Sequence, residues 1–138
     1  MTKKYILAVD QGTTSTRCLL YNEHKTLLAT ASREITQLYP QEGFVEHDPM
    51  ELYNTVIETI EEVITDTGIK VEEIAGIGIT NQRETTILFD KETGLPVYNG
   101  IVWQCRRSSD ICFRLIEEGL EKYIRENTGL ILDPYFSA

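Results

Sequence analysis

The sequence contains few of the residues that build disulfide frameworks and metal sites, with three cysteines and two histidines in 138 residues. Three is an odd number, and Cys18, Cys105 and Cys112 form no Cys-x-x-Cys pair, so the sequence indicates neither a disulfide framework nor a zinc site. His24 and His47 lack a second histidine or a paired carboxylate at helical spacing, so we expect surface or turn residues rather than ligands or bases. This cysteine usage favours a reducing, cytoplasmic compartment.

Long apolar runs and basic charge are also scarce. No run approaches the length of a membrane span, and only five apolar residues separate the N-terminal Met-Thr-Lys-Lys from Asp10, too few for the core of a signal peptide. Thirteen Lys and Arg against 22 Asp and Glu give a net charge of −9. This charge argues against a nucleic-acid binder and against a protein that binds membranes through basic residues.

The sequence does have enough apolar material for one folded domain. A chain of 138 residues and 15.8 kDa with 41% hydrophobic residues suits one domain with a real core and is too short for two large ones. Acidic residues crowd residues 34–73, where Lys70 is the sole basic side chain. We expect this stretch to form a solvated face rather than a metal site.

The N-terminal stretch has the pattern of a β-hairpin. Residues 5–9 are apolar and short enough for a buried strand, and Asp10 marks the point where that strand leaves the core. Gly12 has no Cβ and permits a tight turn close to a bulky anion, after which residues 15–21 run back beside the first strand. The turn therefore suits phosphate binding, although it lacks the Gly-Lys-Ser/Thr of a P-loop.

The side chains of this turn suit phosphate as well. Thr13, Thr14 and Ser15 offer hydroxyl and backbone N–H donors to phosphate oxygens. Arg17 adds positive charge nearby. Asp10 could bind Mg²⁺ directly or through water, because that cation prefers carboxylate and water oxygens. The residues alone leave a second interpretation open, in which Asp, Gly and Thr serve only an ordinary hairpin turn.

The rest of the chain has the order of an α/β fold. The expected elements are a third antiparallel strand at 26–35, a loop at 37–47, a helix from Asp48-Pro49 to Gly68, a strand at 74–80, a hairpin at 85–98 that 101–103 continue, and helices at 106–118 and 120–127. The apolar period of the first helix predicts a buried stripe that includes Tyr53 and Ile57. A parallel pairing of 74–80 with the first strand would bring Asp10 and the residues after Thr80 to one sheet edge, where α/β folds bind ligands.

A set of short motifs extends along nearly the whole chain. In order, they are Asp10-Gln-Gly-Thr-Thr-Ser, Val45-Glu-His-Asp-Pro49, Gly78-Ile-Thr-Asn-Gln-Arg-Glu-Thr-Thr86, Tyr98-Asn, Ile101-Val-Trp-Gln-Cys-Arg-Arg107, Asn127-Thr-Gly-Leu130 and Asp133-Pro-Tyr-Phe-Ser137. With them the sequence resembles the glycerol kinase branch of the FGGY carbohydrate kinase family. An Asp-x-Gly-Thr loop is shared by many sugar kinases and actin-like ATPases, but the Arg-Glu, Trp and Asp-Pro-Tyr-Phe elements together are specific to the glycerol branch.

The resemblance implies a ribonuclease H-like (actin-like ATPase) fold of the α/β class, with a mixed sheet and flanking helices. Such enzymes have two domains around a cleft and transfer the ATP γ-phosphoryl group to glycerol, giving sn-glycerol 3-phosphate. Full-length members are several times longer than this chain, so we expect residues 1–138 to be the N-terminal part of the first FGGY kinase domain, with the second domain absent. The family's catalytic aspartate and most of its adenine pocket lie beyond residue 138, so no catalytic residue is assigned here.

The resemblance also implies roles for the hairpin residues. The contacts to the phosphates of ATP or ADP fall on Gly12, Thr13, Thr14, Ser15 and Arg17. Asp10 is assigned to Mg²⁺, through water. The implied partners are ATP and glycerol, with no nucleic acid and no membrane, and a homo-oligomer is expected for the full-length form. Residues 1–138 alone are expected to be inactive, because half of the cleft is missing.

Four further residues would bind glycerol by this resemblance. Arg83 donates to two hydroxyl oxygens, Glu84 accepts from hydroxyl protons, and Trp103 forms an apolar wall for the C–H edge. Tyr135 contributes its hydroxyl. Without the resemblance, the first two residues would be interpreted as a surface ion pair, the tryptophan as core, and the tyrosine as poorly ordered near a chain end.

Two other functions remain open at this point. One is a non-enzymatic ATP-binding module of the actin or chaperone kind, in which the loop switches conformation and no small substrate is phosphorylated. Such a module has no reason to gather Arg83, Glu84 and Trp103 beside a phosphate loop. The other is an FGGY kinase for xylulose or another sugar, which we would not expect to carry this Arg-Glu and Asp-Pro-Tyr-Phe combination.

Overall fold

The structure, a computed structural model, describes residues 4–136 and divides into two units. The first unit consists of Met1–Thr36 and Asp48–Gln82, and the second consists of Gln37–His47 and Arg83–Ala138. Within the described residues, none of the helices combines the length and the hydropathy that a bilayer span requires.

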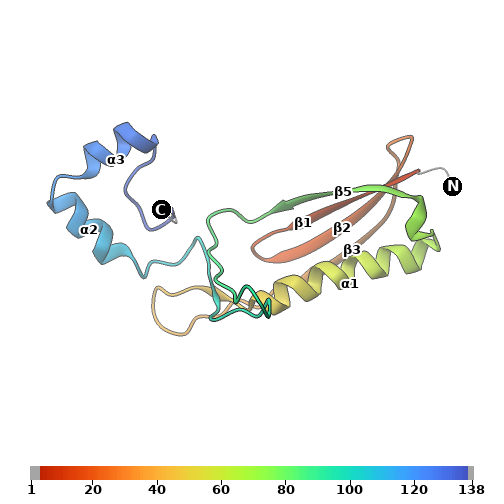
Figure 1. The fold of residues 1–138 in the computed structure, drawn as a ribbon, viewed down its shortest axis with the longest axis horizontal. Helices are drawn as coiled ribbons and strands as arrows, with labels where there is room; N and C mark the ends of the chain where they lie inside the picture. The colour runs from red at the N-terminus through yellow and green to blue at the C-terminus, as the bar shows by residue number, and fades with distance from the viewer. Residues whose placement is uncertain (1–3, 137–138) are drawn as a thin grey trace. The chain divides into compact units, whose positions relative to one another are not determined.

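A mixed four-stranded sheet forms the centre of the first unit. Its strands are β1 (Tyr5–Gln11), β2 (Ser15–Asn22), β3 (Leu27–Glu34) and β5 (Ile74–Asn81), in the order β3-β2-β1-β5 (Figure 1). The first three form an antiparallel meander, and β5 lies parallel to β1. A parallel partner needs a crossover, which α1 (Pro49–Thr67) and the short 3₁₀ helix η1 (Val71–Glu73) provide. The predicted meander and the predicted parallel pairing are both confirmed.

The core of this unit lies between the sheet and α1, which runs along the sheet in Figure 1. Side chains alternate across a strand, so every second residue of β1 and β2 faces the helix. The buried core residues are Leu7, Val9, Cys18, Leu20, Ala31 and Val63. Ile77 and Ile79 of β5 pair with Leu7 and Val9 and therefore lie on this same face, yet they are 53% and 71% exposed, because α1 packs mainly against β2 and β3. Within this unit the helix thus covers one face of the meander and leaves β5 uncovered.

Helix α1 begins and ends where its sequence signals predict. The Asp48 side chain accepts a hydrogen bond from the N–H of Met50 at 2.8 Å, and Pro49 occupies the first helical position, where no intrahelical N–H is needed. Gly68 ends the helix with a φ of 64°, in the left-handed region that glycine adopts without a Cβ clash.

The buried stripe of α1 differs from the predicted one, because it contains threonines. Its buried residues are Leu52, Thr55, Thr59 and Val63. Tyr53 and Ile57 are 60% and 37% exposed, so the prediction that they belong to this stripe is wrong. Threonine is tolerated here because each hydroxyl has a partner. Thr59 donates to the carbonyl of Thr55 at 2.8 Å, and the Thr55 hydroxyl lies 2.8 Å from that of Thr16 on β2.

The second unit is built around a small antiparallel pair. Strand β4 (Glu46–His47) pairs with β6 (Gly100–Ile101), and single bridges join Leu38 to Glu46 and Thr86 to Ile101. Helices α2 (Ser109–Glu117) and α3 (Glu121–Thr128) follow, close to their predicted ranges.

The structure of this unit differs from the sequence prediction at two places. Residues 37–47 were expected to form a loop, but their last two residues form β4. His47 is fully buried, with Nε2 2.9 Å from Oε1 of Gln37, so the expectation of a surface or turn histidine is wrong. The predicted hairpin at 85–98 is present but has no regular strands: one bridge joins Phe89 to Pro96, and backbone hydrogen bonds link Val97 to Leu88 and Asp90 to Leu95. Strands of two residues have no hydrophobic period that a sequence could reveal.

Candidate functional site

The turn between β1 and β2 is closed by backbone hydrogen bonds. The N–H of Gly12 donates to the carbonyl of Ser15 at 2.9 Å, and the N–H of Ile35 donates to the carbonyl of Thr14 at 2.9 Å. A Cβ on Gly12 would lie 3.1 Å from the Ser15 carbonyl oxygen, tighter than an ordinary contact, so a larger residue would force the turn to shift. The turn is therefore held in one geometry that only glycine fits without adjustment.

Asp10 and Arg17 flank this turn and lie directly opposite each other in the β1–β2 register. Both are exposed. Their neighbours Val9 and Cys18 are buried under α1, so the two charged side chains leave the opposite face of the sheet. Between them lie three hydroxyl residues that are exposed or half-buried: Thr13, Thr14 and Ser15. The hairpin thus presents one carboxylate, one guanidinium and three hydroxyls together.

This donor set can be compared with what a divalent cation requires. Among residues 4–136 no group of three or more His, Cys, Asp or Glu side chains is placed to hold a metal ion. Asp10 alone is not a cage for a free cation. Mg²⁺, however, is usually bound through one or two carboxylates while substrate phosphates and waters complete its shell. The hairpin fits Mg²⁺ that arrives with a nucleotide.

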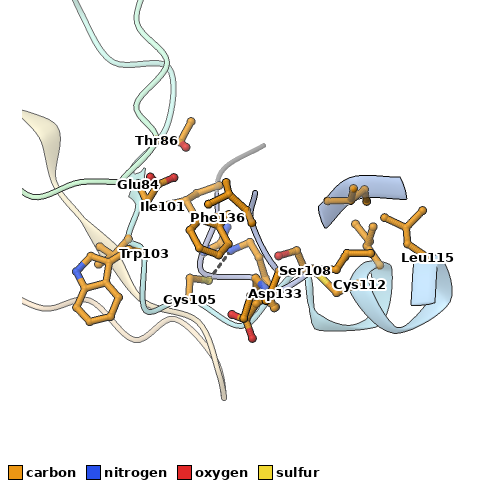
Figure 2. A pocket seen from close by; sticks show the side chains of 18 of the residues that line it. Glu84, Thr86, Ile101, Trp103, Cys105, Ser108, Cys112, Leu115, Asp133 and Phe136 are labelled. Carbon is orange, nitrogen blue, oxygen red and sulfur yellow. Dashed lines mark hydrogen bonds between the residues drawn. The ribbon is translucent and has the colours of Figure 1, made fainter. Parts of the chain in front are cut away.

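The second unit contains a pocket of about 630 Å³. Figure 2 shows Glu84 and Trp103 at one end of this pocket and the α2 residues Cys112 and Leu115 at the other. Its lining combines mostly apolar and aromatic side chains with a few polar groups, the composition expected of a small-molecule site.

One backbone pairing positions both Glu84 and Trp103. Thr86 and Ile101 exchange two hydrogen bonds, at 3.0 and 2.9 Å. Glu84 lies two residues before Thr86, and Trp103 lies two residues after Ile101. The backbone of Glu84 has a φ of 62°, an uncommon left-handed conformation for a residue with a side chain. Such strained residues cluster at ligand sites, where the surrounding structure holds them.

An aromatic cluster joins Trp103 to the C-terminal part of the described chain. The rings of Trp103 and Tyr135 meet edge to face, with centroids 5.4 Å apart, and Tyr135 packs similarly on Phe136 at 4.9 Å. Asp133 holds this segment, since it accepts from the N–H of Tyr135 at 2.8 Å and from Arg106 at 3.0 Å. These two interactions lower the pKa of Asp133. Trp103 and Tyr135 are both half-buried, so neither is a core residue.

The predicted site residues therefore form two groups. The hairpin of the first unit gathers Asp10, Gly12, Thr13, Thr14, Ser15 and Arg17. In the second unit Glu84 and Trp103 line the pocket, and Tyr135 contacts Trp103. Arg83 is exposed and is not among the described residues that line the pocket. It directly follows Gln82, whose N–H donates to the carbonyl of Gln11 at 2.7 Å.

The sequence analysis assigned no role to a buried charged cluster in the second unit. Glu46 is 1% exposed and accepts hydrogen bonds from Arg107, Asn99 and Tyr98. Burial raises the pKa of Glu46, but these hydrogen bonds outweigh it and the pKa is lowered overall. Burial likewise opposes the charge on Arg107, but its bonds to Glu46 and Cys105 raise its pKa. The sequence did contain a signal for this cluster, because Glu46 and Arg107 both lie within the family motifs quoted above.

Comparisons with known proteins identify the family. The model of the N-terminal domain of the FGGY family of carbohydrate kinases matches residues 5–138. Glycerol kinase from Shewanella woodyi is 60% identical over 137 residues, which are 99% of this chain and 28% of that protein. Glycerol kinase from Aliivibrio fischeri is 58% identical over 135 residues, which are 98% of this chain and 27% of that protein. This chain thus spans about 28% of the length of the curated relatives it matches.

Solved structures give the same result. The glycerol kinase of Plasmodium falciparum, determined with ADP, has a TM-score of 0.89 at 32% identity and covers 99% of this chain and 28% of its own. A ligand-bound xylulose kinase from Lactobacillus acidophilus has a TM-score of 0.81 at 25% identity, over 96% of this chain and 26% of its own. These neighbours are sugar kinases of the actin-like ATPase fold, which confirms the predicted fold class.

Proposed function

Because the chain belongs to the FGGY family of carbohydrate kinases, we propose that it forms the N-terminal part of a glycerol kinase. The enzyme transfers the γ-phosphoryl group of ATP to glycerol and yields sn-glycerol 3-phosphate. One observation carries the proposal: Glu84 and Trp103 line one pocket in a chain that is 60% identical to a glycerol kinase. Residues 1–138 are the first part of the first kinase domain, and a second domain outside these residues completes the enzyme.

The β1–β2 hairpin binds the phosphates of ATP or ADP in this proposal. Gly12 keeps the turn tight, and Thr13, Thr14 and Ser15 donate hydroxyl and N–H groups to phosphate oxygens. Arg17 neutralises part of their charge. Phosphoryl transfer depends mainly on positioning and charge stabilisation, so a rigid turn with these donors is what the chemistry requires of this unit.

Asp10 is the residue that would hold Mg²⁺, through water. A cation bound there would supply positive charge to offset that of the phosphates during transfer. The exposed position of Asp10 opposite Arg17 leaves its carboxylate accessible to a hydrated cation. A carboxylate engaged in this way is a poor base, because a nearby positive charge lowers its proton affinity.

Glycerol is bound by the second group of residues. Glycerol offers three hydroxyls and a short C–H edge, so a selective site needs fixed donors and acceptors beside an apolar wall. Glu84 accepts hydrogen bonds from hydroxyl protons, and the Arg83 fork donates to hydroxyl oxygens. Trp103 supplies the apolar wall, and Tyr135, in edge-to-face contact with it, adds a phenolic hydroxyl.

No general base is assigned within residues 1–138. We propose that the base and the adenine contacts come from the part of the enzyme outside this chain, and that the chain alone is inactive for this reason. We further propose that the enzyme works in the cytoplasm, since three buried free cysteines suit a reducing compartment, and that it is a homo-oligomer.

A substrate panel tests the proposal. The full-length protein is supplied with Mg-ATP and with glycerol, xylulose or gluconate, and ADP release is followed by a coupled assay. We expect turnover with glycerol far above that with either sugar. Turnover of xylulose or gluconate without glycerol turnover would overturn the substrate assignment. ATP binding without polyol-dependent turnover would support the actin-like or chaperone-like binding module instead.

A further inference from the structure

The buried carboxylate of Glu46 holds one chain segment at both of its ends. Tyr98 and Asn99, which precede β6, donate to Glu46 at 3.1 and 2.9 Å, and Arg107, which follows β6, donates to the same carboxylate at 2.5 Å. We call Glu46, Tyr98, Asn99 and Arg107 the Glu46 clamp. Within residues 4–136 no buried side-chain nitrogen or oxygen lacks a hydrogen-bond partner, so the clamp is fully satisfied.

Trp103 lies in the middle of the clamped segment. It sits in a tight turn in which the N–H of Cys105 donates to the carbonyl of Val102 at 2.8 Å. Both sides of this turn are bonded to the segment that directly precedes β4, the strand that carries Glu46. The N–H of Val102 donates to the carbonyl of Val45 at 3.1 Å, and the N–H of Arg106 donates to that of Gly43 at 2.8 Å. These hydrogen bonds leave the backbone of Trp103 little conformational freedom.

Arg107 connects the clamp directly to the pocket. Its guanidinium lies over the Phe44 ring, 4.1 Å from the centroid, and its Nε donates to the sulfur of Cys105 at 3.0 Å. Arg107, Phe44 and Cys105 all line the pocket, as does Trp103. The planar guanidinium of Arg107 thus contacts Phe44, Cys105 and Glu46 at the same time. A lysine ammonium cannot reproduce this set of contacts.

The energetics indicate a role in geometry rather than in stability. Removing two charges from water costs free energy that their attraction seldom exceeds, so apolar residues of similar volume would often stabilise such a site as well or better. A carboxylate with three directed donors instead specifies one arrangement of its neighbours. Losing one partner would leave a buried charge unsatisfied and would loosen every segment that the clamp joins.

We propose that Glu46 and Arg107 are positioning residues for the polyol. They hold the turn that presents Trp103 and, through the pairing of Ile101 with Thr86, the segment that presents Glu84. This inference rests on the proposed function and adds a determinant of polyol affinity that acts through the placement of Trp103 and Glu84. Loss of the clamp is expected to impair polyol binding while ATP binding is retained.

Kinetics of the full-length protein test the inference. Glu46→Gln removes the charge, and Arg107→Lys keeps it but removes the fork. For both we expect the glycerol KM to rise about 10- to 100-fold, because a displacement of about 1 Å at a positioning group costs up to that much. The ATP KM should stay unchanged. Glu62→Gln is the matched control, since Glu62 pairs with Arg33 in a half-buried Arg–Glu pair of the first unit, away from the clamp. It should leave all constants as in the wild type.

A merely structural role predicts a different pattern. Fewer active molecules would lower kcat for both substrates with both KM values unchanged, and that result would overturn the inference. Tyr98→Phe removes one donor from Glu46 and leaves the charge pair, so it covers the case in which Glu46→Gln fails to fold. We expect a smaller rise in glycerol KM with the ATP KM unchanged, and an unchanged glycerol KM would also contradict the inference.

A second readout separates this inference from the proposed function. Trp103 is the one tryptophan of the 138-residue chain, so its emission reports the clamped turn without any substrate. In this chain we expect a red shift and stronger acrylamide quenching for Glu46→Gln but not for Glu62→Gln. If the full-length protein turned over no polyol, the proposed function would fail while this shift still supported the clamp. An unshifted emission in Glu46→Gln would overturn the clamp.

Discussion

The hydrogen bond between Thr16 and Thr55 joins the β1–β2 hairpin to α1, and its removal gives an asymmetric prediction. Both residues are buried, at 0% and 6% exposure, and their hydroxyl oxygens are 2.8 Å apart. Thr55 also donates to the carbonyl of Leu52 at 3.0 Å. Thr55 therefore donates its hydroxyl proton to the Leu52 carbonyl and accepts a hydrogen bond from the Thr16 hydroxyl.

The two valine substitutions have different costs for this reason. In Thr16→Val, Thr55 keeps its bond to Leu52, so we expect the free energy of unfolding to fall by about 0.5–1.5 kcal/mol, the net worth of one hydrogen bond. In Thr55→Val, the Thr16 hydroxyl stays buried without its acceptor, and the expected loss is about 1–3 kcal/mol. In the double variant no hydroxyl is left unsatisfied, so it should be more stable than Thr55→Val alone.

Urea denaturation of the 138-residue chain, followed by far-UV circular dichroism, measures these differences. The m-value should be unchanged, so that the midpoint reports stability alone. Thr65→Val, at an exposed position of the same helix, is the matched control and should change stability by less than about 0.5 kcal/mol. If the two single costs were equal and simply added in the double variant, the bond would contribute nothing and the reasoning would be refuted.

Three further predictions concern the cap, the pH dependence and the isolated chain. Asp48→Ala removes the side-chain acceptor that caps α1 and should lower the free energy of unfolding, measured in urea, by about 1 kcal/mol. Asp48→Asn keeps an acceptor oxygen at this position and should retain most of that stability. The pKa of Glu46 is lowered because hydrogen bonds outweigh its burial, so the stability it gives is complete above its unfolded pKa of about 4.3 and is lost as pH falls through the lower folded value. Acid titration of Glu46→Gln should therefore show a shallower loss than the wild type, and equal slopes would contradict this. The 138-residue chain should release no glycerol-dependent ADP, whereas turnover near that of an intact kinase would place the base within it and make Asp10 and Glu84 the first residues to substitute.

The sequence predicted the first unit well because its signals are local and long. Strands of seven or eight residues and a 19-residue helix leave a hydrophobic period, and Asp48-Pro49 and Gly68 mark the helix ends through backbone chemistry that depends on few neighbours. The detail it missed, threonine in place of Tyr53 and Ile57 on the buried face, depends on partners such as Thr16, which is 39 residues away. A hydrophobic period reflects only neighbours within a few residues, so it cannot reveal a hydrogen-bond partner 39 residues away.

The second unit was harder to predict because its order comes from side chains that are distant in sequence. Glu46 finds its donors 52, 53 and 61 residues away, so a charged residue in an apparent loop becomes fully buried. Trp103 and Glu84 were predicted from their resemblance to family motifs, and the Thr86–Ile101 pairing that holds both agrees with the expected continuation of the hairpin by 101–103. The left-handed backbone of Glu84 likewise has no sequence signal, since glutamate rarely adopts it.

Kinetics of Arg83→Ala in the full-length protein test the central claim, that residues of this chain form the polyol site of a glycerol kinase. Arg33→Ala, which removes a half-buried arginine that pairs with Glu58 and Glu62 in the first unit, serves as control. We expect kcat/KM for glycerol to fall about 5- to 150-fold, the equivalent of about 1–3 kcal/mol for an unpaired polar partner, with the ATP KM unchanged. Unchanged KM and kcat/KM for glycerol in Arg83→Ala would contradict the assignment of the polyol site.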